Sequence, residues 1–207
     1  MWHNVEQNSD EWFKLRIGKA TSSNFSKIMA YDCKKWGQGA IEYAEKIALE
    51  IATGERDETN FKSYYMERGH ELEPLAIQMY EKLKFCSVTN GGFFSDNDCF
   101  GDSPDGIIND IGCLEVKSVV PKTQWKRIKS GKYDETYKWQ IYGHLLIGGF
   151  KWCDFVSFCP EMPENKQLLT FRIERDEEEL NKLNERLIEF WGLVQEHVKI
   201  LTEEGEK

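Results

Sequence analysis

Apolar side chains recur at helical spacing in three long stretches of the chain. The clearest is 176–201, where leucines and aromatic residues return every three to four positions and predict an amphipathic helix that serves packing. The stretch 41–53 shows the same pattern and ends at Gly54, a residue suited to close a helix. The stretch 61–83 contains Pro74, which predicts either a kink or the start of a new helix.

Shorter segments complete the expected secondary structure. Helices are predicted at 10–16, 25–30, 122–130 and 134–146. Strands are predicted at 107–108, 114–118, 152–159 and 168–173, with a hairpin turn at 109–112 and strand propensity over 84–94. This order predicts an α/β fold with a mixed central β-sheet flanked by helices and the active site at one sheet edge. A chain of 207 residues is long enough for one sizeable core, so we expect 1–207 to form a single domain.

The chain is acidic overall, but its charge is unevenly distributed. The net charge is -9, and residues 174–207 hold 11 acidic and 5 basic side chains, which contributes -6 of it. In contrast, residues 116–133 hold six basic side chains and no acidic one. This asymmetry suits a protein that binds a polyanion in a local basic groove, whereas a solvated helix face is the alternative.

Cysteine usage and hydropathy indicate the compartment. The six cysteines are scattered without a Cys-x-x-Cys pair, which argues against zinc ribbons and iron–sulfur clusters and predicts reduced thiols. No stretch reaches the roughly 18 apolar residues of a membrane span, and the N-terminus lacks the features of an export signal. We expect a cytoplasmic protein, in the host cell if viral, with no membrane partner.

The candidate chemistry is concentrated in 101–118. Asp105 lies in a Pro-Asp-Gly turn, where proline presets φ and glycine accepts left-handed geometry, so its carboxylate stands at a rigid corner. The strand 114–118 alternates strictly, which places Glu115 and Lys117 on one face. The Asp105 corner can share that face.

Two carboxylates and an ammonium group together suit metal-dependent hydrolysis of a phosphodiester. Oxygen ligands hold Mg²⁺ or Mn²⁺ and leave positions for water and a substrate phosphate. Lys117 can orient or deprotonate the attacking water. The alternative is a surface hairpin on which Glu115 and Lys117 pair across solvent.

These residues resemble a known nuclease signature. Pro104, Asp105, Glu115, Val116 and Lys117 look like the PD-(D/E)xK motif, and their Ser-Pro-Asp-Gly and Leu-Glu-Val-Lys contexts are similar to the phage lambda exonuclease and YqaJ-type viral recombinase family. The resemblance implies a restriction-endonuclease-like core. It also implies Mg²⁺, with Mn²⁺ as a substitute, as two ions bound by Asp105, Glu115 and the main chain at Val116.

A further metal ligand is expected on the helix that contains Pro74. Gly69 followed four residues later by a glutamate resembles the family's helix-borne ligand, and this spacing selects Glu73. Glu71 is two residues away and cannot closely share a helix face with Glu73, so it stays the alternative. His70 is expected at the surface, because the metal expected here prefers oxygen.

The N-terminal segment resembles another motif of the family. The run 10–18, followed by Thr-Ser-Ser, is similar to the lambda exonuclease N-terminal motif. In that family the matching arginine and serine hold the 5′-phosphate of a DNA end, which implies Arg16 and Ser23, assisted by Ser103 and Gln140. From the residues alone, an ordinary helix cap with a solvent-facing arginine is the alternative.

Two more segments are expected to contact DNA. Tyr137 and Gln140 lie three residues apart on one helix face and are similar to the family's final motif. In the basic helix, the residues expected to line a DNA-binding groove together with Tyr137 are Lys122, Trp125, Lys126 and Arg127.

The resemblance implies a metal-dependent deoxyribonuclease. The expected activity is a 5′-to-3′ exonuclease that degrades one strand of linear double-stranded DNA and leaves 3′ single-stranded tails for viral or prophage recombination, beside a single-strand annealing protein. Some relatives form ring-shaped homotrimers, and the sequence leaves open whether this chain does. The alternatives are a structure-selective or endonucleolytic DNase in repair or defence, and a catalytically silent DNA-binding protein on the same fold.

Overall fold

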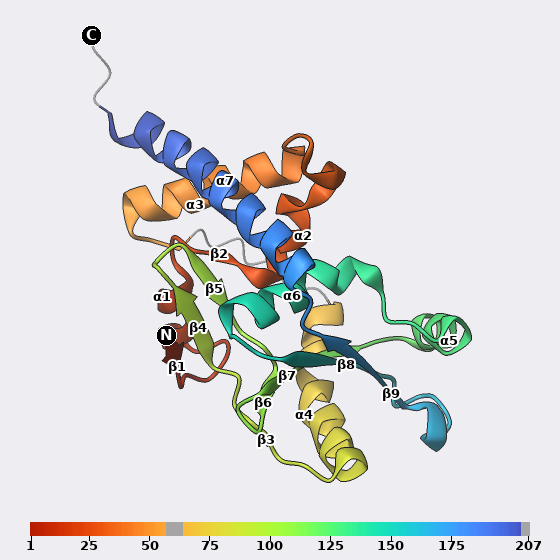
Figure 1. Cartoon of the computed structure of the whole chain (residues 1–207). Helices are drawn as coiled ribbons and strands as arrows, with labels where there is room; N and C mark the ends of the chain where they lie inside the picture. Colours follow the sequence, from red (N-terminus) through yellow and green to blue (C-terminus); the bar gives the residue numbers. More distant parts are fainter. Residues whose placement is uncertain (57–63, 204–207) are drawn as a thin grey trace.

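The computed structural model describes residues 1–56 and 64–203, and its strands form two sheets (Figure 1). The smaller sheet has the order β1-β4-β5-β2, with β1 at Trp2–His3, β4 at Phe93–Asp96, β5 at Phe100–Asp102 and β2 at Ala20–Thr21. The larger has the order β3-β6-β7-β8-β9, with β3 at Val88–Thr89, β6 at Gly106–Ile108, β7 at Gly112–Ser118, β8 at Trp152–Phe158 and β9 at Leu168–Glu174. The parallel pairs β7–β8 and β2–β5 make both sheets mixed. The expected mixed α/β fold is confirmed.

Helices cover both faces of the larger sheet. They are α1 (Asp10–Arg16), α2 (Phe25–Ile28), α3 (Gln38–Thr53), α4 (Tyr64–Lys84), α5 (Pro121–Ser130), α6 (Lys138–Ile147) and α7 (Glu177–Thr202). Short 3-10 turns are η1 (Ser22–Asn24), η2 (Ala30–Cys33), η3 (Glu135–Tyr137) and η4 (Glu164–Lys166). α4 contacts β7 and β8, α6 contacts β8 and α7, and α3 packs along α7 (Figure 1).

Alternation along β7 sends its side chains into two separate cores. Leu114 and Val116 pack in a cluster with Ala76 and Tyr80 of α4. Cys113 belongs to the larger cluster that includes residues of α6 and α7. Because successive strand residues point to opposite faces, the side chain of Glu115 lies on the same side of the sheet as that of Cys113, which is the side of α6.

Most helix ends and the hairpin turn follow the local sequence signals. Ser9 caps α1, because its side chain accepts a hydrogen bond from the Trp12 amide, and Gly54 closes α3 at a φ of 71°. In the turn at 109–112, Asn109 and Asp110 both have positive φ, as a tight hairpin requires. α3 begins at Gln38, three residues before the predicted start.

Two expected boundaries differ from the structure. α4 runs through Pro74 without a break, so a new helix start there is wrong, and residues 61–63 of the predicted helix lie outside the described residues. Pro74 is exposed, so the carbonyl that loses its helical partner can bond water. The segment 134–146 is split into η3 and α6, since the Asp134 side chain caps a 3-10 turn through the Thr136 amide.

The segment 84–94 is not one strand. It holds the end of α4, β3 and the start of β4, and the two strands belong to different sheets. The break lies at Gly91, where a Cβ atom would stand 1.7 Å from the Pro104 carbonyl oxygen. Only glycine allows this approach, which brings the chain against the Asp105 corner.

Two general expectations concern membranes and thiols. Among the described residues, no helix is both long and apolar enough to span a bilayer. All six cysteines are free, as the scattered spacing predicted.

Candidate active site

Asp105 is fastened to β7 by two hydrogen bonds. Its amide donates to the Leu114 carbonyl at 2.9 Å, and its Oδ2 accepts from the Val116 amide at 2.6 Å. The preceding Pro104 is buried, and its carbonyl accepts from the Gln7 side chain at 3.0 Å. The corner predicted from Pro-Asp-Gly is therefore held in place beside Val116.

Glu115 is fully buried and lies between two cationic groups. One carboxylate oxygen forms an ion pair with Lys117, and the other accepts a hydrogen bond from His144 Nε2 at 2.8 Å. Burial by itself would raise the pKa of Glu115, but the Lys117 charge and the His144 hydrogen bond outweigh it and lower this pKa to about 2. Glu115 is therefore a carboxylate held in one orientation.

His144 connects Glu115 to a second buried carboxylate, Asp102. Its Nδ1 lies 2.7 Å from Asp102 Oδ1, and Ser22 donates its hydroxyl hydrogen to the same oxygen. The histidine and both carboxylates are fully buried. Two carboxylate acceptors on one ring require both ring nitrogens to carry hydrogen, so His144 is an imidazolium. Burial would lower the pKa of His144, but the charge of Asp102 and the hydrogen bonds to both carboxylates raise it well above its ordinary value.

Sequence reasoning missed both Asp102 and His144. A signal was present, because His144 is four residues after Gln140 and so shares its helix face. Asp102 directly precedes Ser103, at the end of β5. Neither spacing indicates that the two side chains meet, since 42 residues separate them.

Glu73 and Asp105 add further negative charge. The pKa of Asp105 is raised well above its ordinary value, first by burial and then by the charges of Glu115 and Glu73. Burial and the Glu115 charge also raise the pKa of Glu73. Glu73 lines the same cavity as Asp105, whereas Glu71 is exposed and is not among the described lining residues. The structure therefore places Glu73, and not Glu71, beside the two other carboxylates.

The donor atoms of these groups are of the kind that binds a hard divalent cation. Asp105, Glu115, Glu73 and the main chain at Val116 offer oxygen ligands, which Mg²⁺ and Mn²⁺ prefer. Lys117 and His144 both pair with Glu115, so Asp105 and Glu73 have no ion-pair partner of their own among the described residues. Within the ranges that the structure describes, no three His, Cys, Asp or Glu side chains already surround a common point.

A cavity of about 1060 Å³ joins this cluster to Arg16. Most of its lining comes from α1, the segments on either side of it, α3 and α4, and the lining includes Arg16, Thr21, Asn24, Glu73 and, from the turn after β5, Asp105. The guanidinium of Arg16 lies 4.0 Å from the Trp12 ring centroid, and its Nη2 donates to Thr21 Oγ1 at 3.2 Å.

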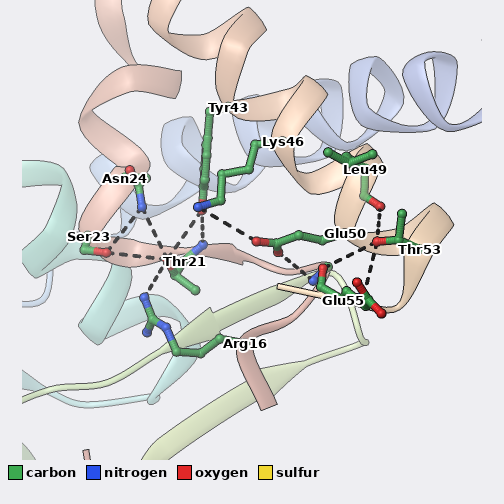
Figure 2. A network of polar contacts seen from close by, with 11 residues as sticks. Arg16, Thr21, Ser23, Asn24, Tyr43, Lys46, Leu49, Glu50, Thr53 and Glu55 are labelled. Atoms are coloured by element: carbon green, nitrogen blue, oxygen red, sulfur yellow. Dashed lines mark hydrogen bonds and ion pairs between the residues drawn. The ribbon is translucent and has the colours of Figure 1, made fainter. Parts of the chain in front are cut away.

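Figure 2 shows how polar contacts converge on Thr21. The Thr21 amide donates to Tyr43 Oη at 2.8 Å, and the Asn24 side chain donates to Thr21 Oγ1 at 3.5 Å. Glu50 accepts from the Gly18 amide at 3.0 Å and so holds the turn between Arg16 and Thr21. The wall around Arg16 is thus built from hydroxyl and amide groups together with the Glu50 carboxylate.

Three other residues expected at the 5′-phosphate are not among the described lining residues of this cavity. Ser23 is exposed, with its Oγ 3.4 Å from Thr21 Oγ1. Ser103 Oγ accepts from Trp12 Nε1 at 2.8 Å and so ties α1 to the Asp105 corner. Gln140 is half-buried on α6, one turn before His144.

The basic helix α5 places its expected DNA contacts on two faces. Lys122, Trp125 and Lys126 are exposed. Arg127 is only 4% exposed, and its Nη1 donates to Ser157 Oγ at 2.6 Å. The expectation that Arg127 lines an open groove is wrong, because helical periodicity turns it toward the sheet. Tyr137 is half-buried beside Lys117, whose Nζ lies 5.2 Å from the Tyr137 ring centroid.

Comparison with known proteins agrees with the nuclease motifs. Residues 11–151 match the family described as the YqaJ-like viral recombinase domain. No curated protein sequence matches the chain significantly.

Solved structures share the fold. The chain is similar to the alkaline exonuclease LHK-Exo from Laribacter hongkongensis, with a TM-score of 0.84 and 29% identity over 93% of this chain and 96% of that chain. The same values hold for LHK-Exo in complex with dAMP. A phage-related exonuclease from Haemophilus somnus 129PT has a TM-score of 0.68 at 16% identity, over 89% of this chain and 96% of that chain. The chain therefore belongs to the YqaJ-like viral recombinase family, on the restriction-endonuclease-like fold of phage-type exonucleases.

Proposed function

We propose that this protein is a Mg²⁺-dependent exonuclease that degrades one strand of linear duplex DNA from its 5′ end and leaves 3′ single-stranded tails. The observation that carries the proposal is the single cavity that contains both Arg16 and the carboxylates Asp105 and Glu73. A guanidinium and a carboxylate cluster in one cavity suit an end phosphate and a scissile phosphate of the same strand. The family and the likeness to the alkaline exonuclease LHK-Exo support this reading.

Asp105, Glu115, Glu73 and the main chain at Val116 are proposed to hold two Mg²⁺ ions, with Mn²⁺ as a substitute. When bound, the metal supplies Lewis-acid stabilisation of charge on the phosphate and a water of lowered pKa. His144 and Lys117 keep Glu115 ionised and oriented for that role.

Lys117 is proposed to orient the attacking water as an ammonium group. Burial would lower the pKa of Lys117, but the charges of Glu115 and Asp105 outweigh it and raise this pKa above its ordinary value. A group in that state donates hydrogen bonds and does not accept a proton. Of the two roles open from the sequence, orientation of the water is therefore favoured.

Arg16 is proposed to bind the 5′-phosphate, assisted by Ser23, Ser103 and Gln140. Among the described residues Arg16 donates one hydrogen bond, to Thr21, whereas a guanidinium carries five N–H donors. The remaining donors can bind phosphate oxygens in a bidentate arrangement, and the Trp12 ring holds the guanidinium plane.

We expect Arg16→Ala to remove most of the preference for 5′-phosphorylated ends, on the order of tenfold, because charge-assisted hydrogen bonds to the phosphate are lost. The measurement compares initial digestion rates on duplexes with phosphate or hydroxyl 5′ ends. Lys14→Ala is the matched control, since Lys14 is an exposed cation on the same helix. Equal rates on both ends for the unmodified protein would remove Arg16 from this role.

We expect Glu73→Gln to weaken Mn²⁺ binding at least tenfold and to raise the Mg²⁺ concentration needed for cleavage, because an amide is a weaker ligand than a carboxylate. Glu71→Gln is the control on the same helix and should behave like the unmodified protein, since Glu71 is exposed. Calorimetric Mn²⁺ titration gives the affinity independently of turnover. Equal effects of the two substitutions would contradict the choice of Glu73.

Digestion of one linear duplex tests the proposed function directly. The duplex is labelled separately at its 5′ and 3′ ends and incubated with Mg²⁺ or a chelator, beside a covalently closed circle. We expect Mg²⁺-dependent release of mononucleotides from the 5′ label and an intact circle. Cutting of the circle would instead favour an endonuclease in repair or defence, and no cleavage with any metal would leave a silent DNA-binding protein.

The proposal includes a role in viral or prophage recombination beside a single-strand annealing protein. It rests on the family, because 3′ single-stranded tails are the substrate that such a partner needs. A ring-shaped homotrimer is a further possibility that the family suggests. Sedimentation of the full chain with and without duplex DNA measures the oligomeric state.

A further inference from the structure

The outer face of α5 carries lysines around one exposed tryptophan. We call this set the α5 stripe: Lys122, Trp125, Lys126 and Lys129. Spacings of three, four and seven residues place all four side chains on one helix face, where they line a hollow of about 480 Å³. In Figure 1, α5 lies at the edge of the molecule opposite α1, so the stripe is separate from the cavity that contains Arg16.

The exposed tryptophan is not needed to attach α5 to the sheet. Trp125 is 54% exposed, whereas Gln124 and Arg127 on the inner face are buried. The Gln124 side chain donates to the Ser157 carbonyl at 3.2 Å, and Arg127 Nη1 donates to Ser157 Oγ at 2.6 Å. A large aromatic ring is thus presented to solvent on a helix that is anchored from behind.

Charge and shape together indicate the class of ligand. Three of the six basic side chains in residues 116–133 belong to the stripe, and this segment holds no acidic side chain, which favours a polyanion with regularly spaced phosphates. The face of an exposed tryptophan stacks on a nucleobase. Lys129 Nζ lies over one face of the Trp125 ring, 5.7 Å from its centroid, so the opposite face is the one offered to a base. A base offers a free face only where it is unpaired.

We propose that the α5 stripe binds single-stranded DNA, with one base stacked on Trp125 and the neighbouring phosphates at Lys122, Lys126 and Lys129. The source of that strand rests on the proposed function, because digestion of one strand of a duplex exposes its complement. Duplex DNA would contact the lysines through its phosphates, but its bases are stacked on one another and could not stack on Trp125. An acidic peptide would also contact the lysines, but it has no base to stack on Trp125.

Binding in the presence of a chelator tests the site without hydrolysis. The probe is a dye-labelled 15-nucleotide oligothymidylate, compared with a relaxed, covalently closed circular duplex that has no unpaired bases. We expect Trp125→Ala to weaken oligothymidylate binding on the order of tenfold and duplex binding less than twofold. Trp125→Phe keeps an aromatic face and should retain most of the affinity.

A matched control is available at the end of α4. Phe85 is 96% exposed and follows two exposed lysines, Lys82 and Lys84, so Phe85→Ala removes an equally accessible ring beside positive charge. It should leave oligothymidylate binding unchanged.

Replacement of the three stripe lysines by glutamine should reduce the salt dependence of binding. The slope of log affinity against log salt concentration should fall by about 0.7 for each lost phosphate contact.

Several outcomes would overturn the inference. If Trp125→Ala loses affinity equally for single-stranded and duplex DNA, the stripe binds phosphates in general. If it loses affinity for neither, Trp125 does not stack on a base. Displacement of the oligonucleotide by a polyglutamate peptide of equal charge and at equal concentration would mean an acidic protein partner. Digestion of linear duplex is measured separately. If the protein binds single strands through Trp125 but does not digest DNA, the proposed function is wrong and this inference stands.

Discussion

Replacing Lys117 by alanine should lower DNA cleavage by a factor on the order of a hundred or more, because the ammonium group that orients the attacking water is removed. The substitution removes the ammonium group paired with Glu115 and leaves the Arg16 cavity intact. DNA binding measured in a chelator should therefore stay close to that of the unmodified protein. Single-turnover cleavage and equilibrium binding, measured on the same preparation, separate the two effects.

Lys138→Ala is a close control for the loss of a paired lysine. The Lys138 side chain is 26% exposed and lies 2.7 Å from Glu179, and the Lys117 side chain is 27% exposed in its own ion pair. Unlike Lys117, Lys138 forms its ion pair with Glu179 of α7 and with none of the carboxylates of the cluster, so its substitution should leave cleavage unchanged. Turnover of Lys117→Ala equal to that of Lys138→Ala would exclude Lys117 from the mechanism.

Replacing His144 by alanine should lower the free energy of unfolding by about 3–5 kcal/mol, the range found when one partner of a buried ion pair is removed. The imidazolium is the shared donor of Asp102 and Glu115, and all three side chains are fully buried. Without it, two carboxylates face each other with Lys117 and Ser22 as their remaining partners. Cleavage should fall as well, because Glu115 loses the contact that orients it.

Urea unfolding followed by circular dichroism measures the stability change. His70→Ala is the control, since His70 is exposed and surface substitutions usually change stability by about 0.5 kcal/mol or less. The double substitution Asp102→Ala with His144→Ala should be less damaging than the sum of the two single ones, because the first removes one of the carboxylates that needs the histidine. A loss below about 1 kcal/mol for His144→Ala would contradict the imidazolium bridge.

Local sequence signals predicted the elements whose geometry depends on neighbouring residues. The Gly54 end of α3 and the hairpin turn at 109–112 both follow from short-range sterics and hydrogen bonds. The two-residue strands β1 and β2 were not predicted, because strands that short carry no periodicity and form only when β4 and β5 are present to pair with them.

For the site, the sequence by itself determined the family motif and the shared strand face of Glu115 and Lys117, because alternation along a strand is a local property. It left open the choice between Glu71 and Glu73, and it wrongly placed Arg127 in an open groove. Only the tertiary structure decided these, because they depend on which face of a helix meets a sheet formed elsewhere in the chain. The same holds for the bridge from Asp102 through His144 to Glu115, which exists because β5, α6 and β7 meet around one buried ring.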